Sequence, residues 1–205
     1  MSINEKIHLD QPKSFAFTSE NKSVIKTILL KYPKNRKASA VLPLLDLAQR
    51  QNNNWIPIKA IECIAKILDI DKMRVLEVAT FYSMFNLKPV GKYFLQVCST
   101  TPCMLRGSDE IIRCIKDKLN ISSGETSKCK KFSILEVECL GACVNAPIVQ
   151  VNDNYYEDLD YVSFSDLLDN LSNDKIPNHG TVIDRNFSEA KNGSTTLKKI
   201  KTIMK

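Results

Sequence analysis

The middle of the chain contains the stretch Tyr93-Phe-Leu-Gln-Val-Cys-Ser-Thr-Thr-Pro-Cys103, and a second stretch of the same kind follows it, Lys131-Phe-Ser-Ile-Leu-Glu-Val-Glu-Cys-Leu-Gly-Ala-Cys143. Their apolar or alternating runs predict two β-strands, over Tyr93–Val97 and Lys131–Glu138. Each strand is followed at once by two cysteines, spaced C-x4-C in the first stretch and C-x3-C in the second. If the two strands are neighbours in one sheet, both cysteine pairs lie at the same edge.

Four cysteines, Cys98, Cys103, Cys139 and Cys143, are therefore the candidate ligands of a metal centre. Two closely spaced pairs supply four thiolates, which bind zinc or an iron–sulfur cluster. The small and turn-forming residues between them allow the backbone to approach the sulfur atoms closely. Spacing alone leaves zinc, iron–sulfur and a plain dithiol open, because C-x4-C also falls within the usual spacing of zinc ligands.

The other three of the seven cysteines are expected to have different roles. Cys63 and Cys114 lie among isoleucines at helical spacing, which predicts small apolar core residues. Cys129 lies between lysines in a polar loop, which predicts an exposed thiol, with recruitment into the metal centre as the alternative. The odd total and the lack of a secretion signal argue against a closed disulfide framework.

The residues before this region have the periodicity of short helices. Apolar side chains at helical spacing, with proline and capping residues at the boundaries, predict helices over residues 19–32, 38–50, 57–68 and 71–85. Four short helices with brief connections indicate a small bundle. Trp55 and the stripe formed by Phe81, Tyr82 and Phe85 are expected to lie mainly in its core.

From residue 89 onward the pattern alternates between strand and helix. An amphipathic helix over Leu105–Leu119, a hairpin around Asn152-Asp153-Asn154 and a last helix ending at Leu171 accompany the two strands. This order is typical of an α/β domain with a small sheet covered by helices. The expected organisation is a flexible N-terminus, a helical domain, an α/β domain and a flexible basic tail, over residues 1–18, 19–88, 89–176 and 177–205.

The net charge of +6 does not indicate a nucleic-acid surface. Residues 1–37 hold eight Lys or Arg against three Asp or Glu, and residues 185–205 hold six against one, so the basic charge lies at the ends. No aromatic residues interleave a basic patch, and no apolar run is long enough to span a membrane. No glycine-rich nucleotide motif occurs. His8, His179 and the acidic run Glu157–Asp160 are expected to be solvated.

Several motifs point to one family. They are Val97-Cys-Ser-Thr-Thr-Pro-Cys-Met-Leu-Arg-Gly107, Gly124-Glu-Thr126, Val137-Glu-Cys-Leu-Gly-Ala-Cys-Val-Asn-Ala-Pro147, Tyr155-Tyr-Glu-Asp-Leu159, Trp55-Ile-Pro-Ile58, Val78-Ala-Thr-Phe-Tyr-Ser-Met-Phe85 and Pro89-Val-Gly-Lys92. Together they closely resemble the thioredoxin-like [2Fe–2S] ferredoxin family over roughly residues 20–175. The resemblance implies an N-terminal helical bundle, then a thioredoxin-like domain with a small mixed sheet flanked by helices. It also implies one [2Fe–2S] cluster on Cys98, Cys103, Cys139 and Cys143.

Within that family the motifs are most similar to members that serve NADH:quinone oxidoreductase, respiratory complex I. This implies an electron-transfer subunit with no catalytic residue of its own, whose cluster accepts single electrons from FMN in a flavin- and NADH-binding partner subunit. A neighbouring multi-cluster iron–sulfur subunit is the second implied partner, and nucleic acid is not one. Without a convincing targeting segment, the expected place is the cytoplasmic face of a bacterial inner membrane, peripheral and held by partners. The alternatives are the diaphorase part of an NAD-linked hydrogenase or formate dehydrogenase, and a zinc-stapled interaction module.

Overall fold

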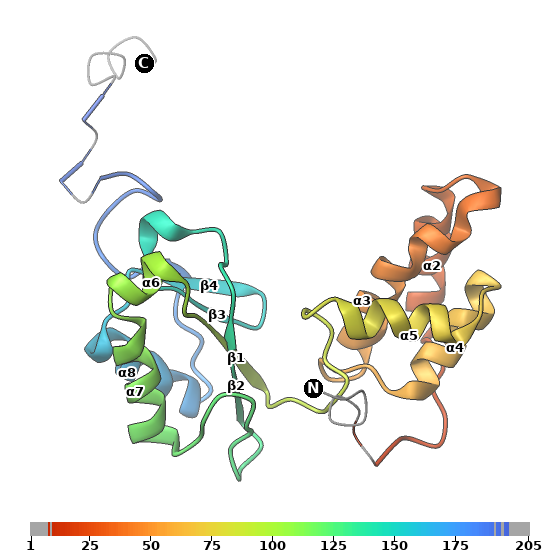
Figure 1. Cartoon of the computed structure of the whole chain (residues 1–205), viewed down its shortest axis with the longest axis horizontal. Coiled ribbons are helices and arrows are strands. Elements are labelled where there is room, and N and C mark those ends of the chain that lie inside the picture. Colours follow the sequence, from red (N-terminus) through yellow and green to blue (C-terminus); the bar gives the residue numbers. More distant parts are fainter. Residues whose placement is uncertain (1–7, 9, 191, 194, 197–205) are drawn as a thin grey trace. The chain divides into compact units, whose positions relative to one another are not determined.

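The computed structural model describes residues 8, 10–190, 192–193 and 195–196. The chain divides into two compact units, Met1–Val90 and Gly91–Lys205, and each has a hydrophobic core of its own (Figure 1). No helix in the described part of the chain is long and apolar enough to cross a membrane.

The first unit is helical, as its periodicity predicts. Side chains cap two of its helices: the Thr18 hydroxyl accepts a hydrogen bond from the Asn21 N–H, and the Asp71 carboxylate accepts one from the Met73 N–H. The elements are α2 (Ser19–Leu30), the 3-10 helix η1 (Lys34–Ala40), α3 (Val41–Gln51), α4 (Ile58–Leu68) and α5 (Lys72–Phe81).

The end of this helical unit differs from the expectation. Helix α5 ends at Phe81, because Tyr82 adopts an extended backbone, so the helix does not continue to Phe85. Phe85 is buried, whereas Phe81 is 79% and Tyr82 41% exposed. The aromatic stripe therefore divides between core and surface, since residues beyond the helix no longer follow its periodicity.

The segment before α2 is more ordered than the sequence predicts. Phe17 is buried in the helical core, and the Gln11 side chain donates to the carbonyl of His8 and accepts from the N–H of Ile58. The His8 ring lies edge-on to Trp55, with 6.0 Å between centroids. Residues of the segment predicted to be flexible therefore contact the helical unit, and residues 1–7 and 9 lie outside the described part.

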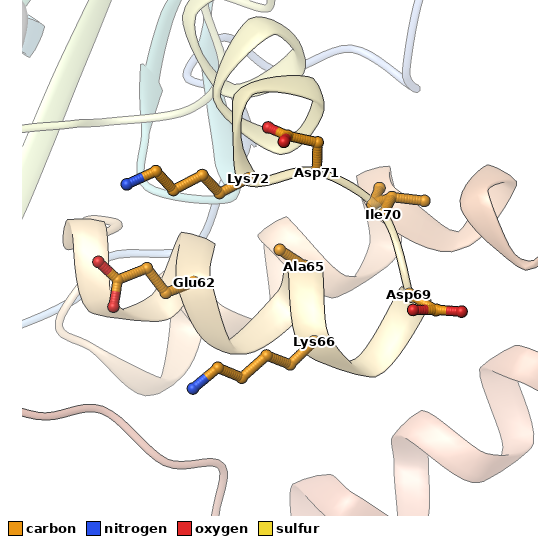
Figure 2. Close-up of a pocket in the computed structure, with 7 residues that line it drawn as sticks. All are labelled: Glu62, Ala65, Lys66, Asp69, Ile70, Asp71 and Lys72. Atoms are coloured by element: carbon orange, nitrogen blue, oxygen red, sulfur yellow. The ribbon is translucent and has the colours of Figure 1, made fainter.

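A pocket lies at the connection between α4 and α5 (Figure 2). Its lining mixes carboxylates and lysines with two apolar side chains, and it contains neither cysteine nor histidine. The residues are Glu62, Ala65, Lys66, Asp69, Ile70, Asp71 and Lys72.

The second unit is a five-stranded mixed sheet in the order β2-β1-β3-β4-β5. Strand β1 pairs in parallel with β2 and antiparallel with β3, and β3 and β4 form the predicted hairpin. The elements are β1 (Tyr93–Cys98), α6 (Thr101–Leu105), α7 (Ser108–Leu119), β2 (Phe132–Val137), the 3-10 turn η2 (Cys143–Asn145), β3 (Val149–Val151), β4 (Asn154–Glu157), α8 (Tyr161–Ser172) and β5 (Gly180–Thr181).

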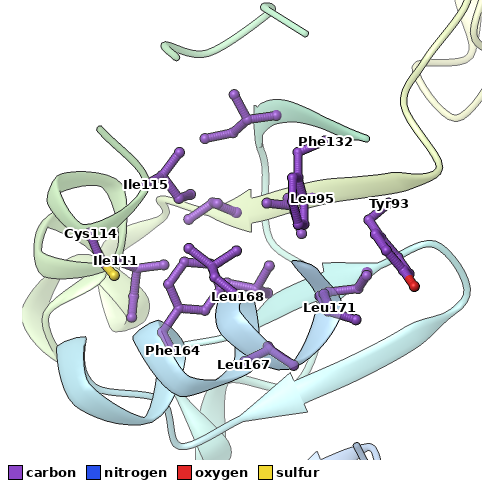
Figure 3. Close-up of a cluster of buried hydrophobic side chains, with 14 of the residues drawn as sticks. Tyr93, Leu95, Ile111, Cys114, Ile115, Phe132, Phe164, Leu167, Leu168 and Leu171 are labelled. Atoms are coloured by element: carbon purple, nitrogen blue, oxygen red, sulfur yellow. The ribbon is translucent and has the colours of Figure 1, made fainter. Parts of the chain in front are cut away.

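Helices α7 and α8 pack together and cover one face of this sheet (Figure 3). Because side chains alternate along a strand, Tyr93, Leu95 and Val97 of β1 point into this core, and Cys98 points to the opposite face. The helices contribute Ile111, Cys114, Ile115, Phe164, Leu167, Leu168 and Leu171 to the core.

The helix predicted over Leu105–Leu119 begins later, as α7 at Ser108, and a separate short helix, α6, precedes it. A break at Arg106 and Gly107 separates α6 from α7, and Gly107 has a φ of 103°, in the left-handed region that favours glycine. As a consequence, Cys103 lies within α6 rather than in a loop before the helix.

Described residues of the expected flexible tail also contact the second unit. Gly180 and Thr181 pair with β4, and the Arg185 guanidinium forms an ion pair with Asp158 at 2.7 Å. Both side chains of this pair are 7% exposed, so Asp158 is buried rather than solvated. His179 is exposed, as expected, and residues 191, 194 and 197–205 lie outside the described part.

Asp160 caps α8, so its removal is expected to destabilise the second unit. Its carboxylate accepts the Ser163 N–H at 2.8 Å, and this bond lowers the pKa of Asp160. We expect Asp160→Ala to reduce the free energy of unfolding by about 1 kcal/mol at pH 7. Because a lowered pKa stabilises the fold only while the carboxylate is ionised, the difference should shrink as the pH falls below about 4.

Urea denaturation followed by circular dichroism at several pH values measures this difference. Asp166→Ala is the matched control, since Asp166 is an exposed carboxylate on the same helix. Equal losses in the two variants at pH 7 would contradict the capping role.

Candidate metal centre

The parallel pairing of β1 with β2 brings the two cysteine loops to the same edge of the sheet. Cys98, the last residue of β1, is in register with Val137, the last residue of β2. The Ser99 N–H donates to the Val137 carbonyl at 3.3 Å, so the pairing continues to where the loops begin. Parallel strands end at the same edge, and Cys139 follows two residues later.

Cys98 and Cys103 form a buried pair. Cys98 is 1% exposed, and Cys103, on α6, is fully buried. Their side chains pack with Ala146 and Ile148 in a small apolar cluster, separate from the core under α7 and α8. The Cys98 N–H also donates to the Ile148 carbonyl at 3.2 Å, which fixes the first loop against the segment that follows the second.

Cys139 and Cys143 form an exposed pair, with 3.4 Å between their sulfur atoms. Between them, Gly141 has a φ of 82°, and its N–H donates to the Cys139 sulfur at 3.4 Å. This left-handed conformation costs glycine little, and it directs a backbone donor at the thiol. Cys143 begins the 3-10 turn η2.

Hydrogen bonds tie the two loops to each other. The Leu140 N–H, in the second loop, lowers the pKa of Cys98, and the Thr100 hydroxyl, in the first loop, lowers the pKa of both Cys98 and Cys139. The Thr100 oxygen lies 3.3 Å from the Cys98 sulfur. Behind the second loop, the Tyr155 hydroxyl donates to the Leu140 carbonyl at 2.9 Å.

In the buried pair, the surroundings lower the pKa of one cysteine and raise the pKa of the other. Burial raises the pKa of Cys98, but hydrogen bonds from Thr100 and the Leu140 N–H outweigh this effect and lower it overall. Burial and, to a smaller extent, the neighbouring Cys98 together raise the pKa of Cys103 to about 12, although the Ile148 N–H acts to lower it.

The exposed pair shows the same division. Hydrogen bonds from the Gly141 N–H and from Cys143 lower the pKa of Cys139, whereas Cys139 raises the pKa of Cys143. Cys98 also acts electrostatically on both Cys139 and Cys143, so the two pairs lie close enough to interact. Like charges this close are both stable only with a cation between them, so a set of four thiolates requires bound metal.

The remaining cysteines lie outside this site. Cys129 precedes β2 and Cys139 follows it, so about 20 Å of extended strand separates them, and Cys129 lies apart from the two cysteine pairs. Cys129 is exposed, and a hydrogen bond with Ser127 lowers its pKa. Cys114 is buried in the core and Cys63 is partly buried, and burial raises the pKa of both.

The four sulfurs form two pairs rather than one compact group. Across the described residues, no three His, Cys, Asp or Glu side chains are grouped so as to hold a single metal ion. Thr100 and Tyr155 are the site residues that the sequence analysis missed. Thr100 lies between the cysteines of the first loop, where a hydroxyl is a natural donor to sulfur, whereas nothing in the sequence links Tyr155 to Leu140.

Residues 25–172 match the family model described as thioredoxin-like [2Fe-2S] ferredoxin. The chain belongs to this family. Among curated relatives of this ferredoxin, it is 57% identical to a protein of Rickettsia bellii and 58% identical to one of Rickettsia typhi, each over 161 residues. Both are named as subunits of NADH-quinone oxidoreductase, and the alignments cover 78% of this chain and 96% and 95% of the relatives.

Two more distant comparisons extend this result. Over 183 residues the ferredoxin is 51% identical to the Dictyostelium discoideum protein named NADH dehydrogenase [ubiquinone] flavoprotein 2, mitochondrial, covering 89% of this chain and 74% of that one. A solved structure of NAD+-reducing [NiFe]-hydrogenase in the H2-reduced state is similar with a TM-score of 0.58 at 17% identity. That match covers 67% of this chain and 23% of the hydrogenase chain, and it supports the fold alone.

Loss of the Tyr155 hydroxyl is expected to loosen the second cysteine loop of the ferredoxin. Tyr155→Phe leaves the Leu140 carbonyl without this donor, so hydrogen exchange of the amides in residues 139–143 should become faster. Tyr156→Phe is the matched control, because its hydroxyl donates to a different carbonyl, that of Pro177, at 3.1 Å. Each variant should lower the free energy of unfolding by about 1 kcal/mol. Mass spectrometry of deuterated fragments measures the exchange rates. Equally faster exchange of the loop amides in both variants would contradict this role.

Proposed function

We propose that this ferredoxin is an electron-transfer subunit of NADH:quinone oxidoreductase, respiratory complex I, and that Cys98, Cys103, Cys139 and Cys143 hold its one [2Fe–2S] cluster. In this role it accepts single electrons from FMN in a flavin- and NADH-binding partner subunit and lies beside a multi-cluster iron–sulfur subunit. The observation that carries the proposal is the meeting of two cysteine pairs at the ends of adjacent parallel strands.

The donor set fits a binuclear cluster. Each iron of such a cluster takes two protein thiolates, which suits a donor set made of two cysteine pairs. The N–H groups of Leu140, Gly141 and Ile148 are directed at cysteine sulfurs, where they stabilise negative charge. When bound, a [2Fe–2S] cluster supplies reversible one-electron transfer, and hydrogen bonds to its ligands tune its potential.

The relatives at 57% and 58% identity support complex I as the assembly, since both are named as subunits of that enzyme. Their bacterial source also supports the cytoplasmic face of an inner membrane, where partners would hold the chain as a peripheral subunit. The hydrogenase similarity, at 17% identity, gives no comparable support to a hydrogenase diaphorase.

Replacing each proposed ligand with serine tests the cluster assignment. We expect Cys98→Ser, Cys103→Ser, Cys139→Ser and Cys143→Ser each to lose most of the iron or to change the electron paramagnetic resonance spectrum of the reduced protein. Cys129→Ser is the control and should keep both, because Cys129 lies at the far end of β2. An unchanged spectrum in all four ligand variants would refute the assignment. A colourless wild-type protein containing zinc would favour the interaction module instead.

Purification of the tagged chain from its native membranes tests the assembly. We expect it to bring down a flavoprotein that contains FMN and oxidises NADH, together with quinone-linked subunits. Recovery with nickel–iron hydrogenase or formate dehydrogenase subunits would contradict complex I while leaving the cluster assignment intact.

A further inference from the structure

The segment that follows α8 folds back across the loop that carries Cys143. Strand β5 pairs in parallel with β4, with Gly180 opposite Tyr156 and Thr181 opposite Glu157. The Val182 N–H then donates to the Glu157 carbonyl at 3.1 Å. Residues 180–189 are called the strap below: the first two form the last strand of the sheet, and Arg185 and Phe187 contact the residues that follow Cys143.

A buried ion pair anchors the strap. The Arg185 guanidinium donates to both oxygens of the Asp158 carboxylate. Its Nη2 lies 2.7 Å from Oδ1 and 2.8 Å from Oδ2, and its Nε lies 3.0 Å from Oδ2. The Thr181 hydroxyl donates to the same carboxylate at 2.6 Å. A paired arginine and carboxylate of this geometry are directional, and removal of either leaves an uncompensated buried charge.

From this anchor, hydrogen bonds reach the residues that directly follow Cys143. The Arg185 guanidinium donates to the Val144 carbonyl at 3.3 Å, and the Asn145 amide donates to the Phe187 carbonyl at 3.4 Å. The Asn145 amide also donates to Glu157, and the Asp158 N–H donates to the Asn145 carbonyl at 2.7 Å. Both residues of η2 after Cys143 are thus held from outside the loop.

Asn145 takes part in most of these hydrogen bonds. It is 2% exposed, and its Oδ1 has no hydrogen-bond partner among the described residues, so its side chain is held by what its N–H2 group donates. The turn itself has few bonds of its own: Asn145 N–H to Ala142 and Ala146 N–H to Cys143. An exposed cysteine on so short a turn needs outside support to keep one position.

We propose that Arg185 and Asn145 are positioning residues for Cys143, and that the strap fixes this sulfur relative to Cys139. The proposal rests on the proposed function only in treating Cys143 as a cluster ligand. Cys139 has a support of its own, the Gly141 N–H, whereas the contacts that hold the turn of Cys143 come from Arg185, Phe187, Glu157 and Asp158.

Hydrogen exchange in the metal-free full-length chain tests the strap without the cluster. We expect Arg185→Gln to speed the exchange of amides in residues 143–146 and 158–159 about tenfold or more, since hydrogen bonds to a charged group are lost. Lys131→Gln is the matched control, because Lys131 also pairs with a carboxylate, Asp174, and a carbonyl, Ser172, in the same unit. Equal effects of the two variants, or no effect of Arg185→Gln, would overturn the proposal.

Two further variants protect this test against simple misfolding. Thr181→Val removes one hydrogen bond to Asp158 and should speed exchange of the same amides by a smaller factor. Arg185→Lys keeps the charge but loses the planar fork that spans Asp158 and Val144, so it should only partly restore protection. Complete restoration by lysine would overturn the bridging role.

The loaded protein gives the second readout. We expect an iron chelator to bleach the visible absorption of the cluster about tenfold faster in Arg185→Gln than in wild type or Lys131→Gln. Removal of groups that orient metal ligands weakens metal binding by about this factor. If the cluster forms and neither bleaching nor exchange changes in Arg185→Gln, the strap proposal fails and the proposed function stands. If wild type acquires no cluster, the proposed function fails, and the exchange result still decides whether the strap holds the turn.

Discussion

The parallel pairing of β1 with β2 is the constraint on which the metal centre depends. It makes Cys98 and Val137 register partners, so the chain leaves both strands at one edge of the sheet. Parallel neighbours need a crossover between them, and α6 and α7 provide it while adding Cys103 from α6. A slip of one residue in this register would turn the Cys98 side chain into the core under α7 and α8. The packing of Leu95 and Val97 in that core therefore also fixes the position of the thiol.

Once the sulfurs are brought together, electrostatics determines what they can hold. Within each pair one pKa falls and the other rises, so one cysteine of each pair loses its proton more readily than the other. Metal binding must release the remaining protons, which makes cluster retention dependent on pH and on the N–H donors around the sulfurs. These donors come from backbone, at Leu140, Gly141 and Ile148, and backbone groups remain whatever the side chains are. A [2Fe–2S] site can therefore rest on few side chains besides its ligands.

The sequence predicted the parts of this structure that depend on local periodicity. The alternation before Cys98 and before Cys139 indicated both strands, and the cysteine spacing indicated both loops. It did not predict the break at Gly107, because the apolar spacing of α7 gives no sign of where the helix begins. Nor did it predict the contact between Arg185 and Asp158, which are polar residues far apart in a chain whose composition there is typical of a tail.

The two halves of the site are stabilised in different ways, and this follows from their exposure. Cys98 and Cys103 are buried, so the packing of the surrounding side chains fixes their positions. Cys139 and Cys143 are exposed, and an exposed loop gains little from apolar burial. Leu140 and Ala142 pack against the buried pair, and beyond that contact the loop depends on hydrogen bonds and ion pairs, which are stronger when they are shielded from water. The burial of the Arg185 and Asp158 side chains meets this condition, so this ion pair can hold a polar segment beside an exposed cysteine.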